Sequence, residues 1–372
     1  MRYKFAAIEA ELNQAYLERR EVVRGLLVGL LARQHVLLLG PPGTAKSALA
    51  EDICSRIGGI YFRWLLARTS TPEELFGPVS LKALEQDSYR RVTAGKLPEA
   101  TIAFLDEIWK CNSAVLNSLL SVLNERLFFN DGQPAPVPLQ MAVGASNELP
   151  EDREELGALW DRFGLRYVVG YIKNPAAFEA MLKGSNGGAR TSLTPEELAQ
   201  AQAEAAAVKV EKVIPFILTL RQKMAEENIA VSDRRWKMAL DLVRANAWLN
   251  GWNEADANDL DVLAAALWQD PEQIPLVRRI IASVANPLDQ EAVDLLDQAM
   301  EVWQEAVQAP EDKATALGAE ANAKLKKITK QLEGLRAEAR EKGRDATRIE
   351  ETLAQVIAWN REVVAKCLGI QI

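Results

Sequence analysis

The feature that most constrains this chain is a turn rich in glycine and proline between an apolar run and a helical pattern. Residues 35–39 have the length and composition of a buried parallel strand, and residues 45–53 have a helical pattern. The turn begins at Gly40 and ends at Lys46-Ser47. Glycines let backbone N–H groups point inward, and these donors and the positive helix end bind phosphate oxygens. The sequence therefore predicts a phosphate-binding loop.

The side chains of this loop have separate expected roles. Lys46 is expected to reach the outer phosphates of a nucleotide, and the Ser47 hydroxyl to ligate Mg²⁺. Ala45 departs from the usual pattern, which has glycine before the lysine. The alternative, an incidental Gly-Pro turn, does not explain why Lys-Ser stands at the required offset. The predicted nucleotide-binding residues are Gly40, Pro41, Pro42, Gly43, Thr44, Ala45, Lys46, Ser47 and Ala48.

A second motif supports the first. Residues 102–105 are apolar and lead into Asp106 and Glu107. Ligand chemistry in open α/β sheets takes place at the carboxyl ends of strands, where these carboxylates would lie. We expect Asp106 to hold Mg²⁺, directly or through water, and Glu107 to polarise the attacking water. Acids at a strand end are common alone, but here a phosphate-binding loop precedes them, so ATP binding and hydrolysis are predicted.

Composition disfavours several other classes of protein. A net charge of −8 over 372 residues argues against a general nucleic-acid binder. A single histidine excludes a multi-histidine metal site, and three scattered cysteines fit no metal or disulfide framework. The apolar runs fall short of the ~20 residues that span a bilayer, and the N-terminus lacks the apolar core of a signal peptide. We expect a cytoplasmic protein with no membrane insertion.

Hydrophobic patterns divide the chain into three regions. Residues 6–33 are predicted to be helical, and helical stretches separate five predicted strands. Strands that alternate with helices indicate an α/β fold with a parallel sheet covered on both sides. The predicted domains are a nucleotide-binding core at 1–170, a helical domain at 171–286 and a tail at 287–372. The strands are predicted at residues 35–39, 60–66, 101–106, 140–145 and 166–170.

The tail has the most regular pattern in the sequence. Apolar residues recur at intervals of three and four in three stretches, with breaks at residues 309–311 and 343–345. Three such helices with short turns predict an antiparallel three-helix bundle. The apolar positions are Val293, Leu296, Met300, Trp303 and Val307, then Leu325, Ile328, Leu332 and Leu335, then Ile349, Leu353, Val356, Val363 and Cys367.

Two segments interrupt the regular patterns of the core. Residues 77–98 are predicted to be two extended arms, and residues 127–138 a hairpin that turns at Asp131-Gly132. Both are surface loops in the simpler interpretation. In the other interpretation they are projections that contact a partner.

These residues together resemble a MoxR-type AAA+ ATPase, most closely the RavA branch. The resemblance rests on the phosphate-binding loop, on Asp106-Glu107, on Asp161-Arg162-Phe163 and on five longer segments. It covers roughly residues 6–286, and the tail more loosely. It implies an AAA+ parallel-sheet core and a helical lid, followed here by the three-helix tail. The five segments are residues 71–78, 97–100, 105–110, 145–150 and 231–237.

The resemblance implies further site residues. Asn147 resembles the sensor-1 residue, whose amide would orient water against the terminal phosphate. Arg162 resembles an arginine finger, which enters a neighbouring subunit's site and stabilises charge on the transferred phosphoryl group. Arg166 is the alternative finger. Arg234 resembles the sensor-2 residue, borne by the lid and reaching the subunit's own nucleotide, and the adjacent Arg235 is the alternative.

The same resemblance implies an assembly and partners. Residues 77–98 would be a helix-2 insert and residues 127–138 a pre-sensor-1 insert, which line the face or pore of a hexameric ring in related ATPases. An arginine finger acts only in trans, so a homo-oligomer, expected to be a hexamer, is implied. The resemblance also implies a von Willebrand A domain partner, a client protein complex, and ATP with Mg²⁺ as cofactors.

Three functions remain open on the sequence. The principal hypothesis is a chaperone-like remodelling ATPase that acts as a ring. The second is a nucleotide-gated assembly scaffold, in which turnover resets a switch and the tail docks a partner. The third is a nucleic-acid translocating motor, with Arg90, Arg91 and Lys96 lining a pore, which the acidic composition disfavours. RavA-like proteins carry a small β-rich domain in the tail, and residues 309–312 are too few to hold one.

Overall fold

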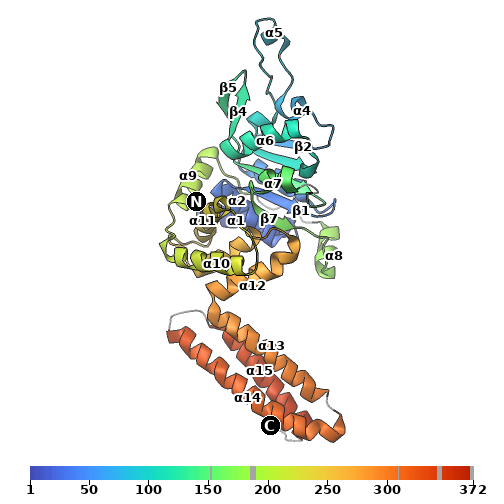
Figure 1. Ribbon diagram of the computed structural model, residues 1–372, viewed down its shortest axis with the longest axis vertical. Coiled ribbons are helices and arrows are strands. Elements are labelled where there is room, and N and C mark those ends of the chain that lie inside the picture. The colour runs from blue at the N-terminus through green and yellow to red at the C-terminus, as the bar shows by residue number, and fades with distance from the viewer. Residues whose placement is uncertain (151–152, 185–189, 309, 342–345, 369–372) are drawn as a thin grey trace. The chain divides into compact units, whose positions relative to one another are not determined.

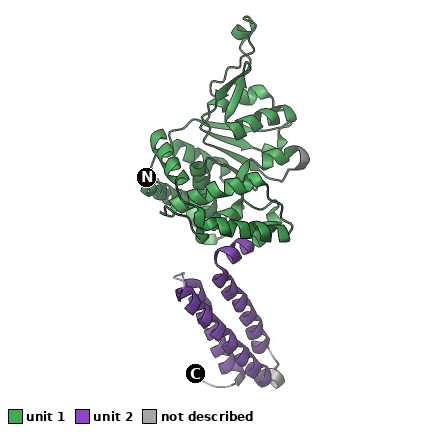
Figure 2. Cartoon of the chain, turned by 60° about the vertical axis from the view of Figure 1, so that its left-hand side comes forward, with its two compact units in different colours: residues 1–278 green, residues 279–372 purple. Residues whose placement is uncertain are grey.

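The structure is a computed structural model that describes residues 1–150, 153–184, 190–308, 310–341 and 346–368 (Figure 1). The chain separates into two compact units, residues 1–278 and 279–372 (Figure 2). Among the helices of the described ranges, none combines the length and the hydropathy that crossing a bilayer requires.

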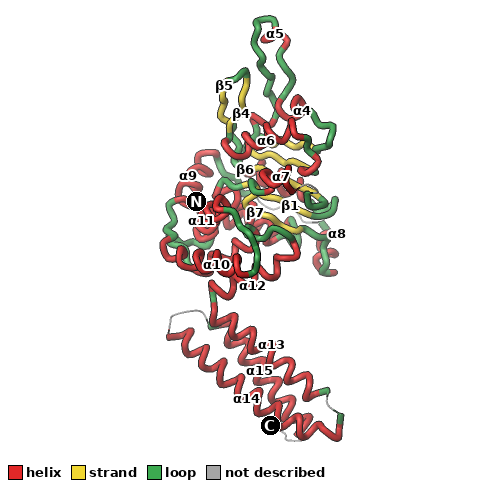
Figure 3. Tube along the Cα trace, in the orientation of Figure 1, coloured by secondary structure: helices red, strands yellow, loops and turns green. Residues whose placement is uncertain are grey.

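A five-stranded parallel sheet organises the first unit (Figure 3). Its spatial order is β2-β3-β6-β1-β7, so the fully buried β1 pairs with β6 on one side and with β7 on the other. The predicted parallel sheet is confirmed. The last strand begins three residues before the predicted 166, because the buried Phe163 already pairs with His35. The strands are β1 (His35–Leu39), β2 (Tyr61–Leu65), β3 (Ile102–Asp106), β6 (Met141–Ser146) and β7 (Phe163–Val168).

Helices surround the sheet and continue beyond it. The α-helices of this unit are α1 (Arg2–Ala15), α2 (Arg20–Ala32), α3 (Lys46–Arg56), α4 (Pro72–Phe76), α5 (Leu81–Leu84), α6 (Ser113–Glu125), α7 (Arg153–Trp160), α8 (Pro175–Lys183), α9 (Pro195–Ala206), α10 (Ile214–Glu226) and α11 (Asp233–Leu249). Helix α12 (Ile274–Ala285) begins in this unit. Short 3₁₀ helices are η1 (Leu97–Glu99), η2 (Ile108–Lys110), η3 (Glu211–Val213), η4 (Ala257–Ala265) and η5 (Pro271–Gln273).

The predicted helix at residues 6–33 is in fact two helices, α1 and α2. They are separated at Glu18, which has a left-handed backbone with φ of 57°. The Glu18 carboxylate accepts the backbone N–H groups of Lys173 and Asn174 at 2.9 and 2.7 Å. The break therefore fastens the segment that follows β7. A helical pattern on both sides of the break concealed it in the sequence.

The two predicted projections are held to each other. Strands β4 (Leu127–Asn130) and β5 (Gln133–Pro136) form the predicted hairpin. The Asn130 side chain accepts the backbone N–H of Arg91 at 2.7 Å and donates to its carbonyl at 3.1 Å. This amide therefore pairs with the backbone of residues 77–98 as a neighbouring strand would. The hairpin and the longer segment lie side by side at one end of the unit in Figure 1.

The second unit is a bundle of three helices, α13 (Pro287–Val307), α14 (Glu311–Glu341) and α15 (Thr347–Leu368). The apolar positions predicted in the second and third helices are buried in a shared core. In α13 the buried face is offset from the prediction, and Met300 is 38% exposed. Most of the two predicted breaks lies outside the described residues. The buried residues of α13 are Leu288, Ala292, Leu295, Ala299 and Ala306.

Small residues account for that offset. Gly318 of α14 lies so close to α15 that an added Cβ would be 2.4 Å from the Cβ of Cys367. Three of the five buried α13 side chains are alanines, Ala292, Ala299 and Ala306. Close helix packing selects small side chains. A sequence pattern built on large apolar residues overlooks them.

His35, the sole histidine of the chain, is buried at the start of β1. Its Nδ1 accepts the backbone N–H of Ala142 at 3.0 Å, so Nδ1 carries no proton. Its Nε2 lies 2.7 Å from the carbonyl of Leu123 and donates to it in this tautomer. Burial, and then the nearby Arg126 charge, lower the pKa of His35 to about 4.

We predict that His35 stays neutral in the folded protein until the pH falls to about 4. The unfolded chain protonates near pH 6.5, so stability falls as pH decreases from 6.5 towards 4, by roughly 3 kcal/mol. With one histidine, imidazole NMR of histidine-labelled protein measures the pKa directly. The control is His35→Phe, whose unfolding free energy should lack this part of the pH dependence. A native pKa near 6.5 would contradict the prediction.

Two glycines of the turn after β1 both have a positive φ, but their surroundings differ. Gly40 has φ of 150°, and an added Cβ would lie 2.0 Å from the carbonyl oxygen of Val169. Gly43 has φ of 79°, and an added Cβ would meet nothing within 4 Å. Both positions oppose an L side chain, but only Gly40 is also pressed against the chain after β7.

This contrast yields a matched pair of variants. Gly43→Ala should cost about 1–2 kcal/mol of unfolding free energy, because alanine resists a positive φ. Gly40→Ala should cost clearly more, because the contact with Val169 must open as well. Urea unfolding followed by circular dichroism measures both. Equal losses in the two variants would show that the close approach at Val169 is unimportant.

Candidate nucleotide-binding site

The carboxyl ends of β1, β3 and β6 bring the predicted catalytic groups to one edge of the sheet. The N–H of Gly40 donates to the carbonyl of Ser146 at 2.9 Å, so the loop begins against the end of β6. Asp106 is the last residue of β3, and Asn147 follows β6. The Asn147 amide donates to Oε1 of Glu107 at 3.0 Å. The structure thus brings Asn147 into contact with the predicted catalytic carboxylate.

Lys46 folds back over the loop. Its Nζ donates to the carbonyls of Gly40 and Pro41 at 2.5 and 2.9 Å. Burial lowers the pKa of Lys46, and the charges of Asp106 and Glu107 oppose that shift. The ammonium group of Lys46 can exchange these carbonyls for phosphate oxygens, because charged phosphate oxygens are stronger hydrogen-bond acceptors than carbonyls. The loop therefore fits a nucleotide polyphosphate.

Ala45 adopts a left-handed backbone conformation, which glycine reaches more easily than alanine. Its φ and ψ are 65° and 20°, in the left-handed region, directly before α3. An L residue in that region stores about 1–2 kcal/mol of strain. The position where the usual pattern has glycine therefore has a backbone conformation that favours glycine.

Both carboxylate oxygens of Glu107 are engaged. Oε1 accepts from Asn147, and Oε2 forms an ion pair with Nζ of Lys110 at 3.1 Å. Glu107 also has a left-handed backbone, with φ of 52°. Strained backbone at a catalytic position directs a side chain that regular structure would turn elsewhere. Sequence reasoning missed Lys110, and its spacing of three from Glu107 was the available signal.

Ser47 and Asp106 offer oxygen ligands suited to Mg²⁺. The Ser47 hydroxyl makes no hydrogen bond within the part of the chain that the structure describes. Asp106 accepts from the N–H of Glu107 at 3.2 Å. Across the described residues no cluster of three or more acidic, histidine or cysteine side chains could hold a metal by itself. The hydroxyl of Ser47 and the carboxylate of Asp106 are the kind of oxygen ligands that Mg²⁺ takes when a nucleotide carries it, with phosphates and waters as the remaining ligands.

Arg162 lies at the opposite edge of the sheet from the loop. It directly precedes Phe163, which pairs with His35 at the start of β1, whereas Gly40 follows the end of that strand. Strand residues rise ~3.3 Å each, so the length of β1 separates Arg162 from the loop. This separation places Arg162 away from the loop of its own subunit, and its role stays a prediction.

Arg234 lies at that same opposite edge. The hydroxyl of Ser232, which caps α11 immediately before it, donates to both carboxylate oxygens of Asp161 at 3.0 and 3.2 Å. Asp161 adjoins Arg162. The lid helix therefore begins beside the amino ends of the strands, away from the loop of its own subunit, and the role of Arg234 stays a prediction.

The two alternative arginines are buried. Arg166 lies between the rings of Trp160 and Trp268, with its guanidinium carbon 4.5 and 5.1 Å from their centroids. Arg235 is fully buried and donates to backbone carbonyls, among them that of Ala266 at 2.8 Å. Burial lowers the pKa of Arg235 to about 10, against the charge of the nearby Asp161. Neither guanidinium is available to a nucleotide.

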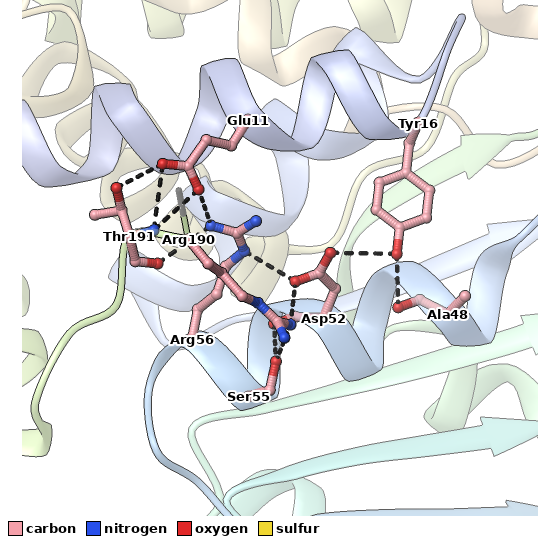
Figure 4. Close-up of polar contacts among 8 residues, drawn as sticks. All are labelled: Glu11, Tyr16, Ala48, Asp52, Ser55, Arg56, Arg190 and Thr191. Carbon is pink, nitrogen blue, oxygen red and sulfur yellow. Dashed lines mark hydrogen bonds and ion pairs between the residues drawn. The ribbon is translucent and has the colours of Figure 1, made fainter. Parts of the chain in front are cut away.

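A polar network on the loop-bearing helix α3 was not apparent in the sequence (Figure 4). Arg56 pairs with Asp52 at 2.9 Å and also with Glu11 of α1. Arg190 donates to Asp52 at 2.6 Å, and the Thr191 hydroxyl to Glu11 at 2.6 Å. The network fastens α1 and the segment before α9 to α3. Only the Asp52–Arg56 spacing of four gave any sign of it.

Comparisons with known proteins agree with this geometry. Residues 3–209 match the family model of the MoxR domain in the MoxR-vWA-beta-propeller ternary systems, and residues 212–281 match an AAA lid domain. Two uncharacterised proteins of Methanocaldococcus jannaschii are each 40% identical to the chain. These alignments cover 78% and 75% of this chain and 77% and 75% of the relatives.

More distant similarities are consistent with the same assignment. The chaperone MoxR1 of Mycobacterium tuberculosis is 29% identical, over 43% of this chain and 43% of its own. A solved structure of a candidate ATPase from Cytophaga hutchinsonii has a TM-score of 0.61 at 16% identity. It covers 76% of this chain and 93% of that chain, a likeness of fold alone. The chain belongs to the MoxR family of AAA+ ATPases.

Proposed function

We propose that this protein is an ATP-hydrolysing, chaperone-like remodelling ATPase of the RavA-like branch, which acts as a homo-oligomeric ring, expected to be a hexamer. The observation that carries the proposal is the meeting of the loop with Glu107 and Asn147 at one edge of the sheet. In this proposal residues 1–170 bind ATP, residues 171–286 form the lid and residues 287–372 form a triple-helical tail.

The residues of that edge divide the chemistry among them. Lys46 neutralises charge on the outer phosphates, and Ser47 and Asp106 would hold the Mg²⁺ that neutralises the rest. Glu107 accepts a proton from water as the water oxygen bonds to the γ-phosphorus. The bond from the γ-phosphorus to the bridging oxygen breaks in line, and ADP and phosphate leave. Asn147 positions Glu107 and the water.

The site is completed in this proposal by the neighbouring subunit. Support comes from the position of Arg162 and Arg234 at the edge away from their own loop. A head-to-tail interface brings one edge of each subunit against the other edge of the next, and such interfaces close into rings. Both guanidinium groups would then meet the charge that develops on the γ-phosphoryl group.

Partners follow from the family rather than from the site. The matched family model is named for systems that contain a vWA component. We propose a von Willebrand A domain partner and a client protein complex in the cytoplasm, with ATP and Mg²⁺ as cofactors. The joined inserts at residues 77–98 and 127–138 would contact the client, since Leu81 and Tyr89 are 77% and 57% exposed.

Steady-state ATPase assays against protein concentration test the proposal. The rate per subunit should rise with assembly, because a neighbour supplies the finger. Glu107→Gln and Arg162→Ala should each lower the assembled rate by at least about 100-fold. Arg361→Ala, an exposed arginine of the tail, is the matched control and should leave the rate unchanged. Light scattering records the assembly of every variant.

Two outcomes would overturn parts of this proposal. Full turnover by dilute monomer, or by Arg162→Ala, would remove the trans arginine. Slow turnover that no variant changes, combined with nucleotide-dependent assembly, would favour the scaffold hypothesis instead.

A further inference from the structure

The guanidinium of Arg235 donates hydrogen bonds to backbone carbonyls on both sides of Arg162. Its Nη2 donates to the carbonyls of Trp160 and Phe163 at 3.4 and 3.2 Å, and its Nη1 donates to Phe163 at 3.2 Å. Nη1 also donates to Ala266 at 2.8 Å and, more weakly, to Gly164 at 3.4 Å. The end of α7 and the start of β7 are therefore tied to a side chain from α11, which belongs to the lid.

Asp161 makes a second connection across the same junction. Its Oδ1 lies 3.4 Å from Nε of Arg235, and both its oxygens accept from the hydroxyl of Ser232. Ser232 in turn accepts the N–H of Arg235 at 3.2 Å and so caps α11. The carboxylate of Asp161 thus holds the start of α11 next to Arg162.

The two arginines that flank this junction are not held. Arg234 is exposed and Arg162 is partly exposed. Neither side chain forms a hydrogen bond or ion pair with any described residue, and Nε of Arg162 is buried without a partner. Among the described residues, the junction therefore has two guanidinium groups without a hydrogen bond or ion pair and a buried one, Arg235, whose two terminal nitrogens are both hydrogen-bonded.

Burial makes the inner arginine rigid. A guanidinium with no exposed surface cannot exchange its carbonyl partners for water, so each broken hydrogen bond leaves an unsatisfied polar group. The planar fork of arginine donates in several fixed directions at once, which lysine cannot reproduce. Displacing α11 from β7 would therefore displace the backbone of Arg162.

We propose that Arg235 and Asp161 are positioning residues, which hold Arg162 and Arg234 as one two-arginine unit for the phosphates of a neighbouring subunit's ATP. This inference rests on the proposed function. The unit forms only while the lid is docked on the core of its own subunit. The lid of one subunit therefore controls hydrolysis in the next, while the subunit's own nucleotide binding stays independent of Arg235.

Mixed assemblies separate positioning in trans from a general loss of fold. Arg235→Gln retains its own loop but should offer a misplaced finger. Lys46→Ala has no working loop but offers an intact finger. Each variant alone should lose ATPase activity, by at least about 10-fold for Arg235→Gln, because small misplacements of a catalytic group are costly. Mixed in equal amounts, they should regain about a quarter of the wild-type rate. The active sites are those at which a Lys46→Ala subunit supplies the finger to the loop of an Arg235→Gln subunit, which is one interface in about four when the subunits mix at random.

Matched measurements make the test specific. Arg162→Ala mixed with Lys46→Ala is the reference and should show the same recovery. Fluorescent-nucleotide titration should give Arg235→Gln the affinity of the wild type, so that kcat falls without weaker ATP binding. Asp161→Asn keeps an oxygen for Ser232 but loses the charge that faces Arg235. It should show a smaller loss and the same complementation, and it decides the matter if Arg235→Gln does not fold.

The outcomes distinguish the two levels of the proposal. If the Arg162→Ala mixture does not recover, the trans site itself fails, whatever Arg235 does. If that mixture recovers and the Arg235→Gln and Asp161→Asn mixtures do not, the positioning role is overturned. A wild-type rate for assembled Arg235→Gln alone would also overturn it.

Discussion

The pairing of β1 between β6 and β7 is the constraint on which the rest of this structure depends. β1 is buried along its whole length, so its backbone groups must pair on both sides. That pairing sets Gly40 against the carbonyl of Ser146 and against the chain after β7 at Val169. The direction in which the phosphate-binding loop leaves the sheet follows from these contacts.

The same pairing divides the polar residues between two edges. The carboxyl ends of the strands carry the loop, Glu107 and Asn147, and the last two contact each other. The amino end of β7 carries Arg162, with Arg234 beside it through Asp161. The phosphate-binding loop and the two exposed-side arginines, Arg162 and Arg234, thus lie at opposite ends of the strands of one subunit. The proposed head-to-tail assembly would bring these two sides of neighbouring subunits together.

Buried arginines stabilise the junction from which Arg162 and Arg234 project. Arg166 and Arg235 both lie inside the protein with one nearby carboxylate, that of Asp161, and both donate to the carbonyl of Ala266. Their desolvation is offset by backbone carbonyls and, for Arg166, by the faces of Trp160 and Trp268. Such a junction is sensitive to small displacements, because polar groups that lose partners in the interior are costly. This sensitivity suits a joint between a core and a lid.

The sequence by itself determined the elements whose signals are local. A loop with glycines and Lys-Ser after an apolar run, and two acids at the end of another run, require no distant residue to be understood. The alternation of strands and helices also predicted the parallel sheet, and repeated large apolar residues predicted the helices of the tail. Patterns of this kind arise from backbone geometry within a few residues.

Only the tertiary structure decided the features that join distant segments. It broke the predicted N-terminal helix at Glu18, because that carboxylate caps residues 173–174. It shifted the buried face of α13 to alanines, because close packing against α14 and α15 depends on neighbours that the local pattern does not contain. It also separated Arg234, which is exposed, from Arg235, which is buried, although the two are adjacent in sequence. The direction of a side chain on a helix depends on what packs against that helix, and no local pattern contains that information.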